Sequence, residues 1–239
     1  MLSSLPDAYQ ALVIGASGAI GGAFVERLQA DPRCAAVRGL HRGSQPAIDL
    51  EDEASIEAAA ATIAAGPALH LLIVATGVLH SPASAGRVGL TPEKRLGQLN
   101  VASLDAIFRI NTFGPALVLR HFAPLLHKQQ RSVLAVLSAK VGSIEDNRLG
   151  GWYGYRASKA ALNMLLKTAA IELRRTHPRT SLVALHPGTV KSALSRPFRG
   201  DEIGREPALA ATQMLDALAG VGEDESGVFL AYDGQRLPW

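Results

Sequence analysis

A tyrosine and a lysine four residues apart, Tyr155 and Lys159, could together move a proton. The stretch 155–176 is rich in Ala, Leu and Lys and predicts a helix, in which residues four apart share one face. An ammonium beside a phenol favours the phenolate and lowers a pKa that starts near ~10. Such a tyrosine could exchange a proton with a substrate hydroxyl or carbonyl near neutral pH. The spacing also occurs by chance in helices, so the pair alone does not decide the function.

A glycine-rich loop at residues 15–22 offers a second chemistry, the binding of phosphate. It lies between a short apolar run at 11–14 and a helical pattern with apolar residues at Ile20, Phe24 and Leu28. Glycines allow a tight turn close to a pyrophosphate, and the helix N-terminus offers N–H groups and a positive dipole end. No Gly-Lys-Ser/Thr is present, which argues against a P-loop nucleotide hydrolase. A plain strand-to-helix turn is the alternative. The predicted cofactor contacts in this loop are Gly15, Ser17, Gly18, Ala19, Ile20 and Gly21.

The residues after the second apolar run, 34–40, bear on which dinucleotide would bind. In dinucleotide-binding folds an acidic residue there holds the 2′-hydroxyl of NAD. This chain has His41 and Arg42 instead, and Arg42 could pair with a 2′-phosphate, so NADP is favoured over NAD. A solvated surface arginine is the alternative. Asp49 and Leu50 could meet the adenine, although an Asp just before a helix is equally typical of an N-cap region.

Short apolar runs alternate with longer helical stretches along the whole chain. The continuous run 69–74 is typical of a parallel strand buried on both faces. Pro115 and Pro124 predict a kink or break in the long helical stretch 103–128. The alternation predicts an α/β fold, a single doubly wound parallel β-sheet of Rossmann type with helices on both faces, in one domain over residues 1–239. The other predicted strands are 132–137, 180–185 and 228–231, and the other predicted helices are 54–65 and 206–219.

Composition narrows the classes of partner. With 48% hydrophobic and 19% charged residues among 239, the chain can bury a core and is not a disordered tail. A net charge of +3 and scattered basic residues among few aromatics argue against nucleic acid as a partner. The longest apolar runs are too short to cross a bilayer, and the first residues lack the features of a signal peptide, so we expect no membrane partner and a cytoplasmic location. The single cysteine, Cys34, excludes an internal disulfide and a Cys-cluster metal site, and we expect no metal.

The glycine loop and the Tyr155–Lys159 pair, in this order, resemble the short-chain dehydrogenase/reductase family over nearly the whole chain. Smaller details resemble its C-factor-like and carbonyl-reductase-like branch. These are Gly142-Ser143-Ile144, the lead-in Gly150-Gly151-Trp152-Tyr153, the segment Tyr232-Asp233-Gly234 and the pair Pro238-Trp239.

The resemblance implies roles for individual residues. Tyr155 would be the general acid/base, Lys159 would hold the nicotinamide ribose and tune Tyr155, and Asn111 would hold a water for a proton relay. Asn111 could otherwise simply bond to backbone where a helix is distorted. The remaining implied cofactor contacts are Ala75, Thr76 and Gly77 beside the adenosine, and Pro187, Gly188, Val190 and Ser192 near the nicotinamide carboxamide.

Two positions depart from the family pattern. Ala19 stands at the middle glycine of the loop, with Gly18 one place earlier. Ala139 stands where the family has its catalytic serine, and Ser138 precedes it. Neighbouring side chains of a strand point to opposite faces, so Ser138 could replace the serine only with a local change of backbone. Ser138, Ser143 or no serine at all therefore remain open.

Together these observations predict an NADP-dependent oxidoreductase that transfers a hydride between nicotinamide and a carbonyl or alcohol. An NADP-binding sensor or signalling module with little turnover is the alternative, because Ala139 removes a catalytic donor. We expect the segment 192–205 to cap the substrate pocket and 79–97 to border it. By family analogy the helices from Ser103 and from Tyr155 would form the interface of a homo-oligomer, a dimer or tetramer.

Overall fold

The computed structural model describes residues 2–84 and 88–239. Six strands form one sheet in the order β2-β1-β3-β4-β5-β6, and every neighbouring pair is parallel. The strands are β1 (Tyr9–Ile14), β2 (Cys34–Leu40), β3 (Leu71–Val74), β4 (Ser132–Leu137), β5 (Thr180–His186) and β6 (Val228–Ala231). The predicted doubly wound α/β fold is confirmed.

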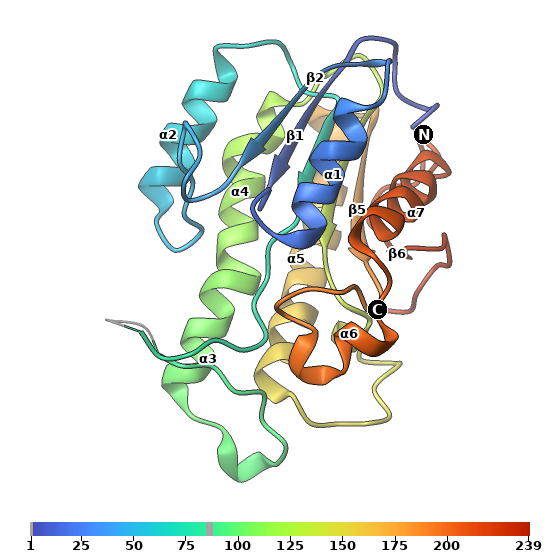
Figure 1. The fold of residues 1–239 in the computed structure, drawn as a ribbon. Coiled ribbons are helices and arrows are strands. Elements are labelled where there is room, and N and C mark those ends of the chain that lie inside the picture. Colours follow the sequence, from blue (N-terminus) through green and yellow to red (C-terminus); the bar gives the residue numbers. More distant parts are fainter. Residues whose placement is uncertain (1, 85–87) are drawn as a thin grey trace.

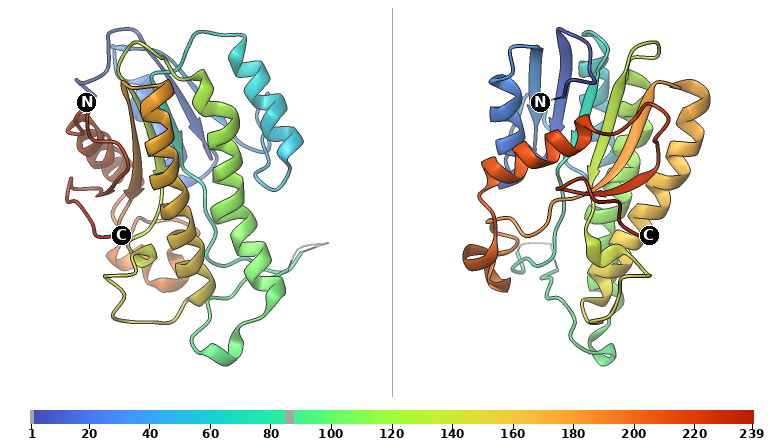
Figure 2. Two further views of the ribbon diagram at one scale, coloured as in Figure 1. Left: turned by 180° about the vertical axis from the view of Figure 1, so that it is seen from behind. Right: turned by 90° about the vertical axis from the view of Figure 1, so that its right-hand side faces the viewer.

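Helices cover both faces of the sheet (Figures 1 and 2). The helices are α1 (Ala19–Gln29), α2 (Glu53–Ala64), α3 (Val101–Phe108), α4 (Gly114–Phe122), α5 (Tyr153–Thr176), α6 (Gly200–Ile203) and α7 (Pro207–Ala219). Buried residues of α1 and α7 form one core with Ala11 and Val13 of β1, and those of α2, α4 and α5 form the other core with Leu12 and Ile14. This alternation is the pleat of a strand buried on both sides. Within the described residues, no helix is long and apolar enough to span a membrane.

The helix predicted over 103–128 is interrupted twice, once just before Pro115 and once at Pro124. A π-helical turn, Arg109–Phe113, separates α3 from α4, and a 3-10 turn, Ala123–Leu125, follows α4. Pro115 lies in the first turn of α4, directly after the π turn. The π turn carries Asn111, and such turns are frequent at functional sites.

The order in which strands are added to the sheet reverses at β1, because β2 lies on one side of β1 and β3 lies on the other. Ala75, just after β3, donates its N–H to the carbonyl of Ile14 at 2.7 Å, which ties the two strand ends together. Ligands of open parallel sheets bind at such a switch point, outside the carboxyl ends of the strands. The glycine loop and the residues that follow β3, β4 and β5 lie at this edge.

Candidate active site

The glycine loop is packed too tightly for any larger residue at its start. Gly15 has φ +91°, and a Cβ there would lie 2.7 Å from the carbonyl oxygen of Ala75. Helix α1 begins after Gly18 with no side-chain cap and no acidic residue in its first turn. These features leave the positive end of the helix open to an anion. Ala19 is exposed, so its methyl group, absent from the family pattern, displaces no packed neighbour.

Arg42 and the residues after it lie along the next stretch of this edge. Arg42 is exposed and makes no hydrogen bond or ion pair with the described part of the chain. Asp49 is tied to the start of α2, since its N–H donates to Ser55 Oγ at 2.9 Å and its carbonyl accepts from the same hydroxyl at 3.0 Å. The N-cap of α2 is Asp52 rather than Asp49, because the Asp52 carboxylate accepts from the N–H of Ala54 at 3.1 Å. Leu50 packs against Gly114, and a Cβ added to Gly114 would lie only 2.6 Å from the Leu50 Cβ.

Asn111 joins three segments of the site and is completely buried. Its Oδ1 accepts from the N–H of Val78 at 2.8 Å, and its Nδ2 donates to the Val78 carbonyl at 2.8 Å and to Ser158 Oγ at 3.2 Å. A Cβ on Gly77 would lie 3.4 Å from Lys159 Nζ and 3.5 Å from Asn111 Oδ1. Lys159, Asn111 and the loop after β3 therefore converge at one point.

Lys159 and Tyr155 are both buried, at 2% and 8% exposure. Lys159 Nζ donates to the carbonyl of Leu137 at 2.9 Å, at the end of β4. Burial lowers the pKa of Lys159 to about 8 and raises the pKa of Tyr155 to about 12. The sequence analysis predicted that the ammonium would lower the phenol pKa. This prediction is wrong for the structure, because desolvation of the phenolate acts in the opposite direction.

The three candidate positions for a catalytic serine have different surroundings. Ser138 Oγ donates to Asn163 Oδ1 at 2.6 Å. Ser143 Oγ donates to the Trp239 carbonyl at 3.1 Å and accepts from the N–H of Asp146 at 3.1 Å. Ala139 belongs to the apolar cluster that contains Tyr155. Both serine hydroxyls thus have partners elsewhere, and the position beside Tyr155 carries only a methyl group.

Aromatic rings form a wall from Tyr155 to the segment predicted to cap the pocket. The Trp152 ring meets the Tyr155 ring edge-on at 6.2 Å between centroids, and the Phe198 ring at 4.9 Å. His80 lies edge-on to Phe198 at 5.8 Å, and its Nε2 is 3.2 Å from the carbonyl oxygen of Ala193 and 3.1 Å from that of Leu194. The segment 192–205 therefore contacts both the aromatic wall and the loop after β3.

The capping segment is held together at its base. Lys191 donates its N–H to the Arg205 carbonyl at 2.9 Å, and Arg205 donates to the Thr189 carbonyl at 3.1 Å. Just before this pairing, Gly188 has φ +65°, and a Cβ there would meet Arg205 and the ring of Tyr232. Within it, the hydroxyls of Ser192 and Ser195 are 3.1 Å apart. Of the implied carboxamide contacts, Pro187, Gly188 and Val190 thus lie between β5 and the capping segment, and Ser192 is the first residue of that segment.

The segment 79–97, which was expected to border the substrate pocket, packs near Tyr155 at two residues. Leu79 and Leu90 belong to the apolar cluster of Tyr155. Residues 85–87 lie outside the described residues. Glu93, which the sequence analysis did not single out, is buried and accepts a hydrogen bond from the N–H of Gly154, one residue before Tyr155.

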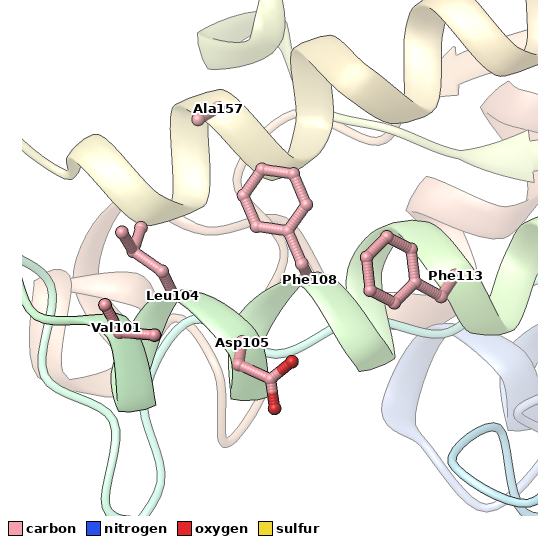
Figure 3. A pocket seen from close by; sticks show the side chains of 6 residues that line it. All are labelled: Val101, Leu104, Asp105, Phe108, Phe113 and Ala157. Carbon is pink, nitrogen blue, oxygen red and sulfur yellow. The ribbon is translucent and has the colours of Figure 1, made fainter.

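A separate apolar groove of about 460 Å³ lies on the outer face of α3 and α5 (Figure 3). Neither Tyr155 nor Lys159 lines it. Its position on the outside of the helix layer distinguishes it from the site at the sheet edge. The groove is lined by Val101, Leu104, Asp105, Phe108, Phe113 and Ala157.

A phosphate-binding loop and a buried phenol at the same sheet edge are the layout of a dinucleotide-dependent oxidoreductase. A family model described as short chain dehydrogenase matches residues 9–203. The chain therefore belongs to the short-chain dehydrogenase family and is an NAD(P)-dependent oxidoreductase.

The individual relatives agree with the branch that the sequence details suggested. A 1-hydroxy-2-glutathionyl-2-methyl-3-butene dehydrogenase of Rhodococcus sp. (strain AD45) is 29% identical over 82% of this chain and 80% of its own. The C-signal protein of Myxococcus xanthus is 34% identical over 60% of this chain and 83% of its own. An NADPH-bound carbonyl reductase from chicken fatty liver is 26% identical, with a TM-score of 0.83 over 100% of this chain and 96% of its own. The predicted C-factor-like and carbonyl-reductase-like branch is confirmed.

Proposed function

We propose that this protein is an NADP-dependent carbonyl reductase or alcohol dehydrogenase in which Tyr155 transfers the proton. The observation that carries the proposal is the convergence of Lys159 Nζ with Asn111 Oδ1 at Gly77, because Lys159 lies one turn after Tyr155 on helix α5. The buried phenol has a raised pKa and stays protonated at neutral pH, so it is ready to act as an acid.

The residues at the sheet edge suit a dinucleotide. The open N-terminus of α1 and the loop 15–21 would hold the pyrophosphate, and Arg42 would pair with a 2′-phosphate. Thr76 Oγ1 is buried with no hydrogen-bond partner in the described part of the chain, so a bound nucleotide could supply one. Asp49, Leu50, Ala75 and Gly77 would border the adenosine. The carboxamide would meet Pro187, Gly188, Val190 and Ser192.

The protein's share of the chemistry is to orient the substrate and move a proton. The cofactor, when bound, supplies or accepts the hydride. In reduction, the Tyr155 hydroxyl gives its proton to the carbonyl oxygen, and in oxidation the phenolate takes the proton from the alcohol. Lys159 would hold the ribose beside Tyr155, and Asn111 would hold the water through which the phenol regains its proton.

Ala139 favours the second candidate, an NADP-binding sensor with little turnover. Without a serine hydroxyl beside Tyr155, the carbonyl oxygen has one donor fewer, and losing such a donor costs on the order of 10²-fold in rate. The two candidates separate in one assay, which follows NADPH absorbance with a panel of aldehydes, ketones and quinones. Turnover of any panel member supports the reductase. Tight NADPH binding with no turnover across the panel supports the sensor.

Replacing Arg42 with Ala tests the choice of cofactor. A charge-assisted bond to a phosphate contributes about 1.5–3 kcal/mol, so we expect the Kd for NADPH to rise about 10- to 100-fold and the Kd for NADH to stay unchanged. The measurement is titration of each reduced cofactor by fluorescence. Arg38→Ala, which removes another exposed arginine nearby on β2, is the matched control. Equal weakening of NADPH and NADH in Arg42→Ala would exclude the 2′-phosphate contact.

We further propose that the outer face of α3, α4 and α5 is the interface of a homo-oligomer. Val101 is 82% exposed, and the groove of Figure 3 lies beside it. Leu166 of α5 is buried in the sheet-side core, whereas Leu165 points outward at 39% exposure. Several exposed apolar side chains on neighbouring helices are typical of an interaction surface. The other exposed apolar residues of this face are Phe113, Met164 and Ile171.

Met164→Glu would place a charge in this face and is expected to convert the oligomer to a monomer. Met164 is 67% exposed, so the change leaves the core of the subunit intact. Light scattering after size-exclusion chromatography gives the mass of each form. Leu209→Glu, on the exposed side of α7, is the matched control and should keep the mass of the unaltered protein. A monomeric unaltered protein would rule out the interface.

A further inference from the structure

Glu93 is a buried carboxylate at the beginning of the helix that carries Tyr155. It comes from the irregular segment between β3 and α3 and is only 6% exposed. Its Oε2 accepts from the N–H of Gly154 at 3.1 Å, and its backbone carbonyl accepts from the N–H of Trp152 at 2.5 Å. Glu93 thus holds two backbone N–H groups, those of Trp152 and Gly154, immediately before Tyr155, across a separation of 61 positions for the Gly154 bond.

Helix α5 has no local means of closing its N-terminus. Its N-cap residue, Trp152, provides no side-chain hydrogen bond, and its first turn contains no acidic residue. The first N–H groups of a helix need outside acceptors, and a negative charge there is favoured by the helix dipole. Glu93 supplies both the acceptor and the charge from a distant part of the chain.

The backbone at Trp152 also needs support of its own. Trp152 adopts φ 52° and ψ 44°, a left-handed conformation that is unfavourable for a large side chain. The bond from its N–H to the Glu93 carbonyl holds it there. This conformation places the Trp152 ring against the rings of Tyr155 and Phe198. This backbone bond remains in any Glu93 variant, so a change of the Glu93 side chain would reach Trp152 and Tyr155 through the loss of its bond to the N–H of Gly154, which lies between them.

The Glu93 carboxylate fits closely against the helix. A Cβ added to Gly154 would lie 2.9 Å from Glu93 Oε1, so only glycine leaves room for the side chain at this approach. The Glu93 carboxylate thus occupies the space that a side chain at residue 154 would need. A shift of the carboxylate would therefore move Gly154, and Tyr155 is the next residue along the helix.

We propose that Glu93 is a positioning residue for the reaction: it fixes the first turn of α5, and thereby the direction of the Tyr155 hydroxyl and the place of the Trp152 ring. The inference rests on the proposed role of Tyr155. Glu93 acts through the backbone of residues 152–154. Because small displacements of a reacting group reduce rates strongly, the hold on this turn matters for catalysis as well as for folding.

The test compares Glu93→Ala with Glu93→Gln, using NADPH and a carbonyl substrate from the panel. Glu93→Ala is expected to lower kcat, normalised to the number of NADPH-binding sites, about 10- to 100-fold and to raise the substrate KM. Glu93→Gln should keep kcat within about threefold, since its amide oxygen can still accept from the N–H of Gly154. Lys94→Ala, an exposed neighbour, is the matched control and should leave both constants unchanged.

A second readout does not depend on turnover. In a Trp239→Phe background, Trp152 is the only tryptophan, so its emission reports the conformation at the start of α5. The emission should shift in Glu93→Ala and stay in place in Glu93→Gln. If Tyr155→Phe retained activity, the proposed function would fail, yet the emission would still report whether Glu93 holds Trp152.

Three results would overturn the inference. The first is normal kinetics with unchanged Trp152 emission in Glu93→Ala. The second is an equal loss of kcat in Glu93→Ala and Glu93→Gln. The third is a lowered melting temperature in Glu93→Ala with kcat per binding site unchanged. Should Glu93→Ala fail to fold, Gly154→Ala tests the same contact with Glu93 in place. It is expected to lower kcat in the same range, and full activity in that variant would likewise contradict the proposal.

Discussion

Replacing Tyr155 with Phe is expected to lower kcat by about 10²- to 10⁴-fold, the usual contribution of a positioned acid or base. The change removes only the hydroxyl and keeps the ring that packs against Trp152. NADPH binding should be nearly unaffected, because the loop and the N-terminus of α1 lie elsewhere on the sheet edge. The loss should therefore fall on kcat and leave the cofactor Kd unchanged.

The measurement is steady-state NADPH oxidation alongside a direct titration of NADPH. Tyr153→Phe is a matched control, since Tyr153 lies two residues earlier on the same helix and is 36% exposed. That variant should retain full activity. Turnover that survives in Tyr155→Phe would remove the phenol from the chemistry and leave the aromatic cluster with a packing role only.

The central strands were predictable because they are buried on both faces, and the predicted bounds 132–137 coincide with β4. The predicted bounds 34–40 and 228–231 also coincide with β2 and β6, although the edge strand β2 is largely exposed. Where tertiary contacts decide, local sequence was insufficient. A break in the helix 103–128 was expected from its prolines, and α4 does end at the 3-10 turn that contains Pro124. The other break, the π turn, lies where Asn111 bonds to Val78 and to Ser158 of α5.

The site shows the same division between local and distant causes. Spacing and resemblance suffice to select Tyr155, Lys159 and Asn111. The direction of the pKa shift of Tyr155 was predicted wrongly, because the whole fold buries this phenol and the burial raises its pKa. Glu93 lay in an irregular segment with no pattern around it, and its partner is 61 positions away, so no local signal could have identified it.

The alanine beside Tyr155 leads to the second large expectation. Ala139→Ser should raise kcat for carbonyl reduction by about 10- to 100-fold, because it restores one hydrogen-bond donor at the oxygen on which negative charge develops. Ala139 lies two residues after the end of β4 and shares the apolar cluster of Tyr155, so a hydroxyl added there would lie beside Tyr155. The gain should appear in kcat more than in KM, since the bond strengthens as charge develops.

Ser138→Ala separates this effect from the neighbouring serine. Its hydroxyl bonds to Asn163, so its loss is expected to lower the melting temperature and to leave kcat for each folded site unchanged. Adding Tyr155→Phe to Ala139→Ser should abolish the gain, because a donor without an acid cannot complete the reduction. A gain that survived in the double variant would show that the new hydroxyl itself carries the proton.

Ala139→Ser also separates the two candidate functions more sharply than the substrate panel alone. A reductase that works with Tyr155 as its only donor should have modest turnover before the change and greater turnover after it. A sensor with an otherwise assembled site should be inactive before the change and active after it, since the only missing part would be one hydroxyl. No activity in either form, with NADPH bound, would mean that the pocket does not bring a carbonyl to Tyr155. The aromatic wall of Trp152 and Phe198 would then serve to close the nucleotide site rather than to admit a substrate.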